Sequence, residues 1–202
     1  PLFAGHAVET QCDIQSIYGA PGKWYLASVD GVHGPFDWVL SSAPLTQTQA
    51  LFADFNFDLT ARYQAGFTLL CQMTFSPSWD RAVCQDAVVA ELILSGRRPG
   101  RHHPNTLVVH AQDQWASEQI ASEPAMVEQT LRRAAETLLN TDFDSAKLHR
   151  WRYAQVIEQA ASTHWLQPAL QLGACGDWGG TRGAESAFVS AKALATALVN
   201  NG

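Results

Sequence analysis

The sequence predicts an α+β fold, in which antiparallel sheets are flanked by helices. Between Tyr63 and Phe75 apolar and polar residues alternate strictly, as in a strand with one buried face. Residues 7–44 contain short apolar runs separated by glycine-containing turns, which is typical of a β-meander. Apolar residues recur at helical spacing after Pro124 and again after Gly183. The chain has 202 residues, 47% of them hydrophobic, and is long enough to bury a sizeable core.

The N-terminal elements follow from turn signals and capping patterns. Three strands are expected at 8–17, 24–29 and 36–41, separated by turns at 18–22 and 30–31. A short helix should follow, because Thr46 and Gln49 have the spacing of a capping box, and it should end near Phe52. The long strand after it should bury one face, formed by Ala65, Phe67, Leu69, Cys71, Met73 and Phe75.

Strands and one helix are expected in the middle of the chain. Residues 88–94 and 106–111 are predicted strands joined by a basic loop at 95–104, giving about six antiparallel strands in this part. A helix should run from Pro124 to about Asn140, since proline is tolerated in a first helical turn. Its cap would be Ser122 or Glu123, and its apolar stripe should pack against the sheet.

The strand expected at 147–154 has two chemically different faces. Period two places His149, Trp151 and Tyr153 on one face, and Arg150 and Arg152 on the other. The aromatic face could bind a ligand or could consist of ordinary core aromatics. The arginines could contact a cofactor or could form a solvated, salt-bridged face. The sequence leaves both alternatives open.

The stretch 170–198 predicts a ligand site. A short apolar strand is followed by Gly176-Asp177, a glycine-rich turn, and a helix that begins near Gly183. Asp177 can accept hydrogen bonds from sugar-like hydroxyls, and the unpaired N–H groups of the helix start would point toward the same place. The alternative is a plain strand-end turn with Asp177 as a capping residue. The apolar stripe expected on the helix comprises Ala184, Ala187, Ala191, Leu194 and Leu198.

Composition argues against several functional classes. The 13 Lys and Arg residues against 19 Asp and Glu residues give a net charge of −6, and no basic run suggests a nucleic-acid surface. No apolar stretch is long enough for a membrane span, and no secretory signal is evident, so we expect a cytoplasmic protein without membrane partners. Four cysteines, at 12, 71, 84 and 175, lack CxxC spacing, which indicates reduced, mostly buried thiols.

Metal and hydrolytic sites are not indicated by the sequence. His102, His103 and His110 fit no common ligand spacing, so no metal is expected. No G-x-S-x-G motif is present and Ser190 lies within a predicted helix. A nucleophilic serine or cysteine with a histidine base is therefore not predicted.

Three motifs, in order along the second half of the chain, resemble those of FAD-dependent amine oxidases, and of the renalase-like branch in particular. The first is Arg-Pro-Gly-Arg at 98–101, followed by Leu-Val-Val-His-Ala at 107–111. The second is Leu-His-Arg-Trp-Arg-Tyr-Ala at 148–154. The third is the Gly-Asp pair, glycine-rich turn and Ala-rich helix of 176–191. The GxGxxG unit that opens proteins of this family is not found, so we expect a fragment covering the C-terminal two thirds.

The resemblance implies three segments and a mixed architecture. Residues 1–45 would be a partial β-meander of the FAD domain, residues 46–164 the substrate-binding domain, and residues 165–202 the C-terminal strand, turn and helix of the FAD domain. The implied fold is an antiparallel substrate-domain sheet with flanking helices, plus part of an FAD-binding, Rossmann-like α/β domain.

The resemblance also implies a cofactor, FAD, and a set of site residues. Those implied at the cofactor are Gly176, Asp177, Gly183, Ala184, Glu185, Ser186 and, at adenine, Ile14. Those implied in the substrate pocket are Trp151, Tyr153 and Arg152; no catalytic residue is implied.

The expected activity is hydride transfer from an amine or a reduced nicotinamide to the flavin. A non-catalytic domain that binds a small ligand or a partner is the alternative. Without the N-terminal unit, we expect weak FAD binding and little turnover from this chain alone. The sheet edge left open by that unit would favour a homodimer.

Overall fold

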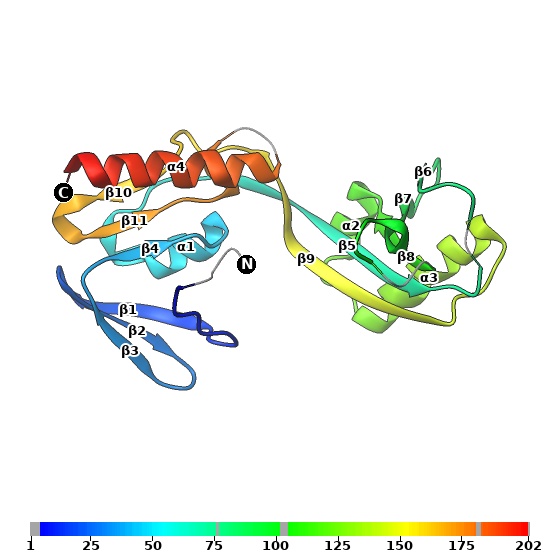
Figure 1. Cartoon of the computed structure of the whole chain (residues 1–202), viewed down its shortest axis with the longest axis horizontal. Helices are drawn as coiled ribbons and strands as arrows, with labels where there is room; N and C mark the ends of the chain where they lie inside the picture. The colour runs from blue at the N-terminus through cyan, green and yellow to red at the C-terminus, as the bar shows by residue number, and fades with distance from the viewer. Residues whose placement is uncertain (1–4, 76, 102–104, 181–182, 202) are drawn as a thin grey trace. The chain divides into compact units, whose positions relative to one another are not determined.

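The computed structural model describes residues 5–75, 77–101, 105–180 and 183–201 (Figure 1). The chain forms two compact units, of which the first joins Pro1–Arg62 with Glu158–Gly202 and the second comprises Tyr63–Ile157. The first unit is thus built from both ends of the sequence. The functional division at 45/46 and 164/165 stays a prediction.

The first unit contains two three-stranded sheets. One is antiparallel, in the order β1 (Ile14–Ala20), β2 (Lys23–Ser28) and β3 (Val32–Phe36). The other has the order β10 (Trp165–Gln167), β11 (Leu172–Ala174) and β4 (Val39–Ser41), with β4 parallel to β11. Its helices are α1 (Leu45–Leu51), α4 (Ala184–Asn201) and three short 3-10 turns, η1 (Ala53–Phe55), η3 (Pro168–Leu170) and η4 (Asp177–Gly179).

Several predictions for the N-terminal part of this unit were wrong. The strand expected at 8–17 is β1, which begins at Ile14 and continues into the expected turn as far as Ala20. The single strand expected at 36–41 is divided between β3 and β4, because β4 leaves the meander to pair with β11. Helix α1 uses no capping box: Pro44 occupies the N-cap position, with φ −48°, and no side chain caps the helix. The helix therefore begins one residue before Thr46, at the first residue after the proline.

Aromatic side chains form much of the core of the first unit. Phe52 is fully buried and its ring lies 5.3 Å from that of Trp165, centroid to centroid. Phe57 contacts both Trp165, at 5.1 Å, and Trp178, at 6.5 Å in a T-shaped arrangement. Edge-to-face pairs of this kind add about 0.5–1.5 kcal/mol each to the free energy gained from burial. Residues from both ends of the sequence thus share one core.

The second unit is built on a five-stranded sheet in the order β6-β7-β8-β5-β9, in which β6, β7, β8 and β5 pair antiparallel with their neighbours. Its strands are β5 (Arg62–Gln72), β6 (Arg81–Val83), β7 (Val89–Leu94), β8 (Thr106–Ala111) and β9 (Ser145–Glu158). Its helices are α2 (Asp113–Gln119), α3 (Pro124–Leu139) and the 3-10 turn η2 (Ser95–Arg97). Helix α2 and strand β6 were not predicted, whereas β7, β8 and α3 were predicted to within about a residue.

The predicted alternation is confirmed for four of the six residues expected on the buried face; Ala65 is half-buried, and Phe75, which lies beyond the end of β5, is exposed. Phe67, Leu69, Cys71 and Met73 are buried on one face of the sheet, in a core shared with Val127, Leu131 and Ala135 of α3 and Ala116 of α2. The helices therefore cover this face. The intervening residues of β5 lie on the other face, which carries the polar cluster described below.

Hydrogen bonds among Arg132, Glu136 and Phe143, here called the charged clasp, join α3 to the loop before β9. Arg132 Nε donates to Glu136 Oε1 at 2.7 Å, and its guanidinium also donates to the Phe143 carbonyl at 2.5 Å. The Phe143 N–H donates to the same Glu136 oxygen at 2.9 Å. Burial raises the pKa of Glu136, but these hydrogen bonds and the Arg132 charge outweigh it, so the pKa is held below 4.5.

Glu136→Gln should therefore lower stability in a pH-dependent way. A carboxyl whose folded pKa is depressed contributes stability above its ordinary pKa and loses it as the pH falls through the folded value. We expect a loss of about 1 kcal/mol in the free energy of unfolding near pH 7, and a smaller loss near pH 3, measured by urea unfolding. The control is Glu118→Gln, at an exposed residue of α2. A loss that is equal at both pH values would contradict the clasp.

Candidate functional site

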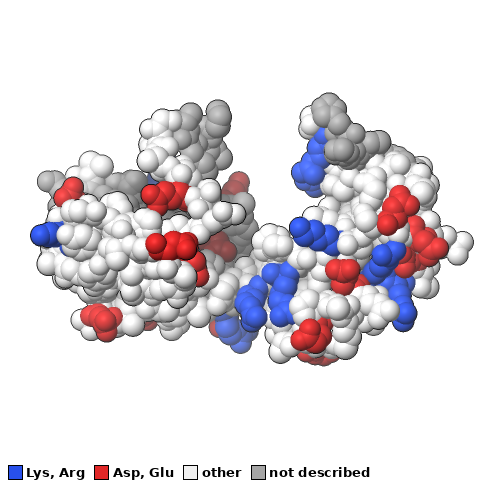
Figure 2. All heavy atoms as spheres, turned by 90° about the horizontal axis from the view of Figure 1, so that it is seen from below, with Lys and Arg blue, Asp and Glu red and all other residues white. Residues whose placement is uncertain are grey.

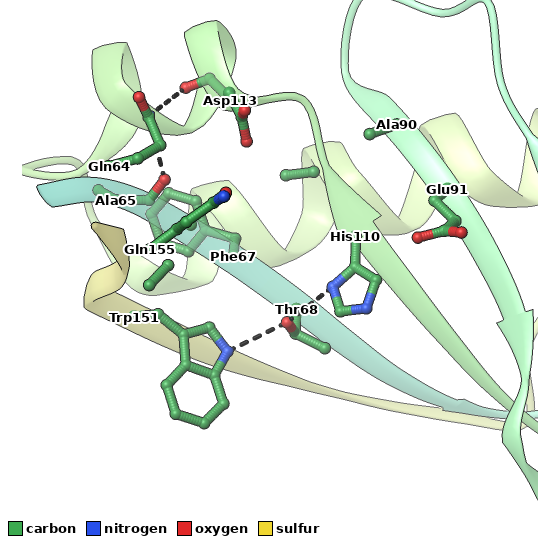
Figure 3. Close-up of a pocket in the computed structure, with 13 residues that line it drawn as sticks. Gln64, Ala65, Phe67, Thr68, Ala90, Glu91, His110, Asp113, Trp151 and Gln155 are labelled. Carbon is green, nitrogen blue, oxygen red and sulfur yellow. Dashed lines mark hydrogen bonds between the residues drawn. The ribbon is translucent and has the colours of Figure 1, made fainter. Parts of the chain in front are cut away.

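A polar cluster crosses three strands of the second unit. Thr68 of β5 lies directly opposite His110 of β8, and His110 lies opposite Glu91 of β7. Residues paired in this way project from the same face of a sheet, and here that face is opposite the one against which α2 and α3 pack. Strand β9 adds Trp151 beside Thr68 (Figure 3).

The hydrogen bonds of the cluster fix its chemistry. The Trp151 indole N–H donates to Thr68 Oγ1 at 3.1 Å, and Thr68 Oγ1 lies 3.2 Å from His110 Nδ1. The indole N–H can only donate, whereas the Thr68 hydroxyl can accept from the indole and donate its own proton to Nδ1; in that arrangement the hydrogen of a neutral imidazole lies on Nε2. This tautomer is inferred from the network. Burial lowers the pKa of His110 below 6.5, which favours the neutral ring.

The cluster borders a hollow with a volume of about 570 Å³. Much of its lining is small, because Ala65, Gly66, Ala90, Ala111 and Ala154 contribute to its walls. Trp151 is 47% exposed and presents its indole ring at the edge of this space, as Figure 3 shows. A flat ligand could therefore lie against the ring and accept a hydrogen bond from His110 Nε2.

Two other predicted pocket residues do not line this hollow. The Tyr153 ring packs against Tyr63 at 5.2 Å, and Arg152 is exposed. Arg150, on the opposite face, lies over the Phe67 ring and donates to the Ser122 carbonyl at 2.6 Å. Arg150 therefore has a structural role. The binding roles of Trp151, Tyr153 and Arg152 stay predictions.

The sequence alone did not reveal the pairing of Thr68 with His110. The alternation predicted for β5 puts Thr68 on the face opposite Phe67 and Leu69, but the residue opposite it depends on the register between β5 and β8, which local patterns do not encode. His110 was considered only as a metal ligand, together with His102 and His103, which lie outside the described residues.

The distribution of acidic side chains does not single out either unit as a binding site. On the face seen in Figure 2, acidic side chains are spread over both units. Within the hollow, the Glu91 carboxylate pairs with the Arg81 guanidinium and is thereby partly neutralised. No helix in the described part of the chain is long and apolar enough to cross a membrane.

In the first unit, the glycine-rich turn packs tightly against α4. Ser190 accepts a hydrogen bond from the Gly176 N–H at 2.9 Å and donates to the Thr163 carbonyl at 2.6 Å. A Cβ on Gly179 would collide with the Thr163 carbonyl oxygen and would lie 2.7 Å from Ser190 Oγ. One on Gly180 would lie 2.6 Å from Ser186 Oγ. These glycines therefore serve close packing of the turn on the helix.

The predicted cofactor residues of this turn lie close together but differ in accessibility. Gly176 is buried, Asp177 is half-buried and Glu185 is exposed. Ser186 is fully buried and its hydroxyl donates to the Asp177 carbonyl at 2.6 Å. Gly183 has φ +86° and open space where a Cβ would be, and Ala184 begins α4. Thr181 and Arg182 lie outside the described residues.

The expected apolar stripe on α4 was partly wrong. The buried face follows Ser186, Ser190 and Leu194, and Ala191 is exposed. The reason is that two buried serines hydrogen-bond to the turn, so that polar residues occupy positions where periodicity alone would expect apolar ones.

Ile14, expected at adenine, lines a second hollow of about 480 Å³ within the first unit. Leu26 of β2, Leu40 of β4 and Leu51 of α1 contribute apolar walls, and Ser41 and Gln47 contribute polar groups. Such a mixed lining suits an aromatic base with polar edges.

The comparisons place the fold among oxidases. No family model matches the chain. A structure assigned as a protoporphyrinogen oxidase from Exiguobacterium sp. 255-15 aligns over 93% of this chain and 46% of its own, with a TM-score of 0.65 and 12% identity. A glycine oxidase from Geobacillus kaustophilus aligns over 96% and 49%, with a TM-score of 0.56 and 10% identity. One from Bacillus cereus aligns over 86% and 45%, with a TM-score of 0.50 and 12% identity.

The expected fold class is therefore confirmed: the chain is α+β and has a fold like that of these solved oxidases. It spans about half the length of the solved structures that it matches.

Ser190→Ala should destabilise the first unit by about 1–3 kcal/mol, because it leaves the buried Gly176 N–H without its acceptor. Urea unfolding followed by tryptophan fluorescence would measure the change. The matched control is Thr196→Ala on the exposed side of the same helix, whose hydroxyl bonds only to the Lys192 carbonyl within α4. Equal effects of the two substitutions would show that the turn does not depend on Ser190.

Proposed function

We propose that this chain is part of an FAD-dependent oxidoreductase of the renalase-like kind, which transfers hydride from an amine or a reduced nicotinamide to the flavin. The observation that carries the proposal is the similarity in fold to three oxidases over 86–96% of the chain. The ordered motifs at 98–111, 148–154 and 176–191 add to it, since they resemble those of this enzyme class.

The residues of the first unit fit the cofactor in two places. The hollow beside Ile14 has the volume and mixed lining that an adenine ring requires. At the start of α4, the N–H groups of Ala184 and Glu185 have no hydrogen-bond acceptor within the helix. Their partial positive charge favours the binding of an anionic group at this position. Gly183 leaves open space beside them. Ser186 differs, because its hydroxyl already donates to the Asp177 carbonyl. It could therefore contact the cofactor only through its backbone.

In this proposal the flavin supplies the hydride acceptor. Asp177 binds hydroxyl groups of the cofactor through its carboxylate, and the N-terminus of α4 stabilises negative charge at the ring edge. The glycines support this arrangement indirectly: Gly179 and Gly180 let the turn pack against α4, and Gly176 leaves room for the Trp178 indole.

The hollow of the second unit is the proposed substrate site. The indole ring of Trp151 offers a stacking surface, and the neutral His110 ring offers an N–H donor beside it. A nicotinamide ring with its carboxamide oxygen matches this pair: the ring stacks and the oxygen accepts. Among the two substrate classes, these contacts favour the reduced nicotinamide.

Titration of the purified chain into FAD should quench flavin fluorescence in a saturable way, with the weak affinity expected in the absence of the N-terminal unit. Asp177→Asn should weaken FAD binding about tenfold, which corresponds to one charge-assisted hydrogen bond of about 1.4 kcal/mol. The control is Asp144→Asn, at an exposed residue of the second unit. A folded chain that leaves flavin fluorescence unchanged would contradict the cofactor proposal.

Trp151→Ala should weaken binding of reduced nicotinamide mononucleotide by about five- to tenfold, the loss expected for one stacked ring. Nucleotide fluorescence during titration of the chain would report binding. Tyr18→Ala, which removes an exposed ring from β1, is the control and should have no effect. If Trp151→Ala and Tyr18→Ala titrate alike, the hollow is not the substrate site.

A further inference from the structure

Three side chains of the first unit form a hydrogen-bonded row. Glu9 Oε2 lies 3.0 Å from His33 Nδ1, and Cys12 Sγ lies 3.4 Å from His33 Nε2. The imidazole therefore has a carboxylate on one nitrogen and a thiol on the other. None of the three residues lines the Ile14 hollow or belongs to the glycine-rich turn, although Asp13, next to Cys12, and Leu26, opposite His33, line the hollow.

Local backbone structure creates this row. His33 lies in β3 opposite Leu26 of β2, so its position is fixed by the meander. Glu9 and Cys12 come from the segment before β1, in which Gln11 adopts a left-handed conformation, with φ 60°. For a residue other than glycine this conformation has an energetic cost, and such backbone strain is often found at functional sites.

Ser28 completes the surroundings of His33. Its hydroxyl oxygen lies 3.3 Å from His33 Nε2, and the hydroxyl donates to the Gly31 carbonyl at 3.2 Å. The Asp30 N–H also donates to this oxygen. Because its proton is directed to Gly31, Ser28 offers His33 only a lone pair. Of the two groups at Nε2, Cys12 is therefore the one whose proton is free to move to the imidazole.

The row contains the groups that can activate a thiol: an imidazole beside it and a carboxylate that orients the imidazole. The Glu9 carboxylate can only accept, so Nδ1 keeps its hydrogen and the imidazole is oriented with Nε2 toward the sulfur. Once the thiol proton has moved to Nε2, the protonated ring donates to Glu9 on one side and to Ser28 and the sulfur on the other. A nucleophile, a base and a group that orients the base are the elements of nucleophilic sites in general.

We propose that Cys12 is a nucleophilic thiol and a modification site for soft carbon electrophiles, with His33 as its base and Glu9 as a positioning residue. In the reaction the Cys12 sulfur attacks the electrophilic carbon and forms a C–S bond. The bond from that carbon to its leaving group breaks with its electron pair, and the thiol proton passes to His33 Nε2. The step requires no oxidant or reductant, and the electrophile is the only co-reactant.

The other three thiols provide an internal comparison. Burial raises the pKa of Cys71 to about 12, and burial also raises the pKa values of Cys84 and Cys175. Among the described residues, Cys12 is the one thiol that hydrogen-bonds to an imidazole. Cys12 and Cys84 are both half-buried, so a difference between them would not be one of exposure class.

The test is the rate at which iodoacetamide alkylates each cysteine, followed by mass spectrometry near pH 7 in the folded chain and in urea. An exposed but unactivated thiol can at most reach its rate in the unfolded chain. We expect Cys12 to react about tenfold faster folded than unfolded, and Cys84 and Cys175 to react more slowly folded. A folded rate for Cys12 at or below its unfolded rate would overturn the proposal.

Variants assign the roles. His33→Asn should reduce the folded rate of Cys12 to its unfolded rate or below, and Glu9→Gln should reduce it several-fold with no change in melting temperature. Asp13→Asn, on the same segment, is the control and should leave the rate unchanged. An unchanged rate in His33→Asn would overturn the base assignment. Alkylation that begins only after a chelator is added would overturn the proposal in favour of a metal site, because the three ligand atoms lie within 4.8 Å of one another.

Discussion

The parallel pairing of β4 with β11 is the contact on which the first unit depends. It joins Val39–Ser41 to Leu172–Ala174, with the whole second unit between them in the sequence. Closing so long a loop is entropically costly, but the intervening residues fold into a unit of their own, which brings the two segments near each other. Gly173 completes the contact, because a Cβ there would lie 2.9 Å from Leu40 and 3.1 Å from Leu194 of α4.

The same contact explains how the C-terminal turn is built. Once β11 is fixed, the chain continues into a turn whose Trp178 is fully buried in the aromatic core, while Ser190 ties Gly176 and Thr163 to α4. The buried Trp178 ring and the Ser190 hydroxyl thus hold the turn in place. What remains accessible is the start of α4 at Gly183 and Glu185. Rigid support beneath an exposed helix N-terminus is the arrangement that an anionic ligand requires.

Local patterns in the sequence were enough to predict the elements whose side chains repeat with one period. Strand β5 and helix α3 were predicted because burial on one face imposes period two or 3.6. The division between β3 and β4 was missed, because a change of sheet depends on a partner strand that is distant in the sequence. The buried serines of α4 were missed because their hydroxyls are satisfied by backbone groups of the preceding turn and of Thr163, whereas a periodicity argument expects apolar residues there.

The sites were harder to predict than the elements for a related reason. In the second unit, the strand pattern placed Thr68 on the open face, but only the register of β8 shows that His110 lies opposite it. The row of Glu9, Cys12 and His33 likewise needs the meander pairing of β3 and the left-handed turn at Gln11. In both cases the residue types are common ones. Their proposed reactivity depends on a neighbouring side chain that comes from another segment of the chain. A histidine hydrogen-bonded to a hydroxyl becomes a directed donor, and one held between a carboxylate and a thiol becomes a base.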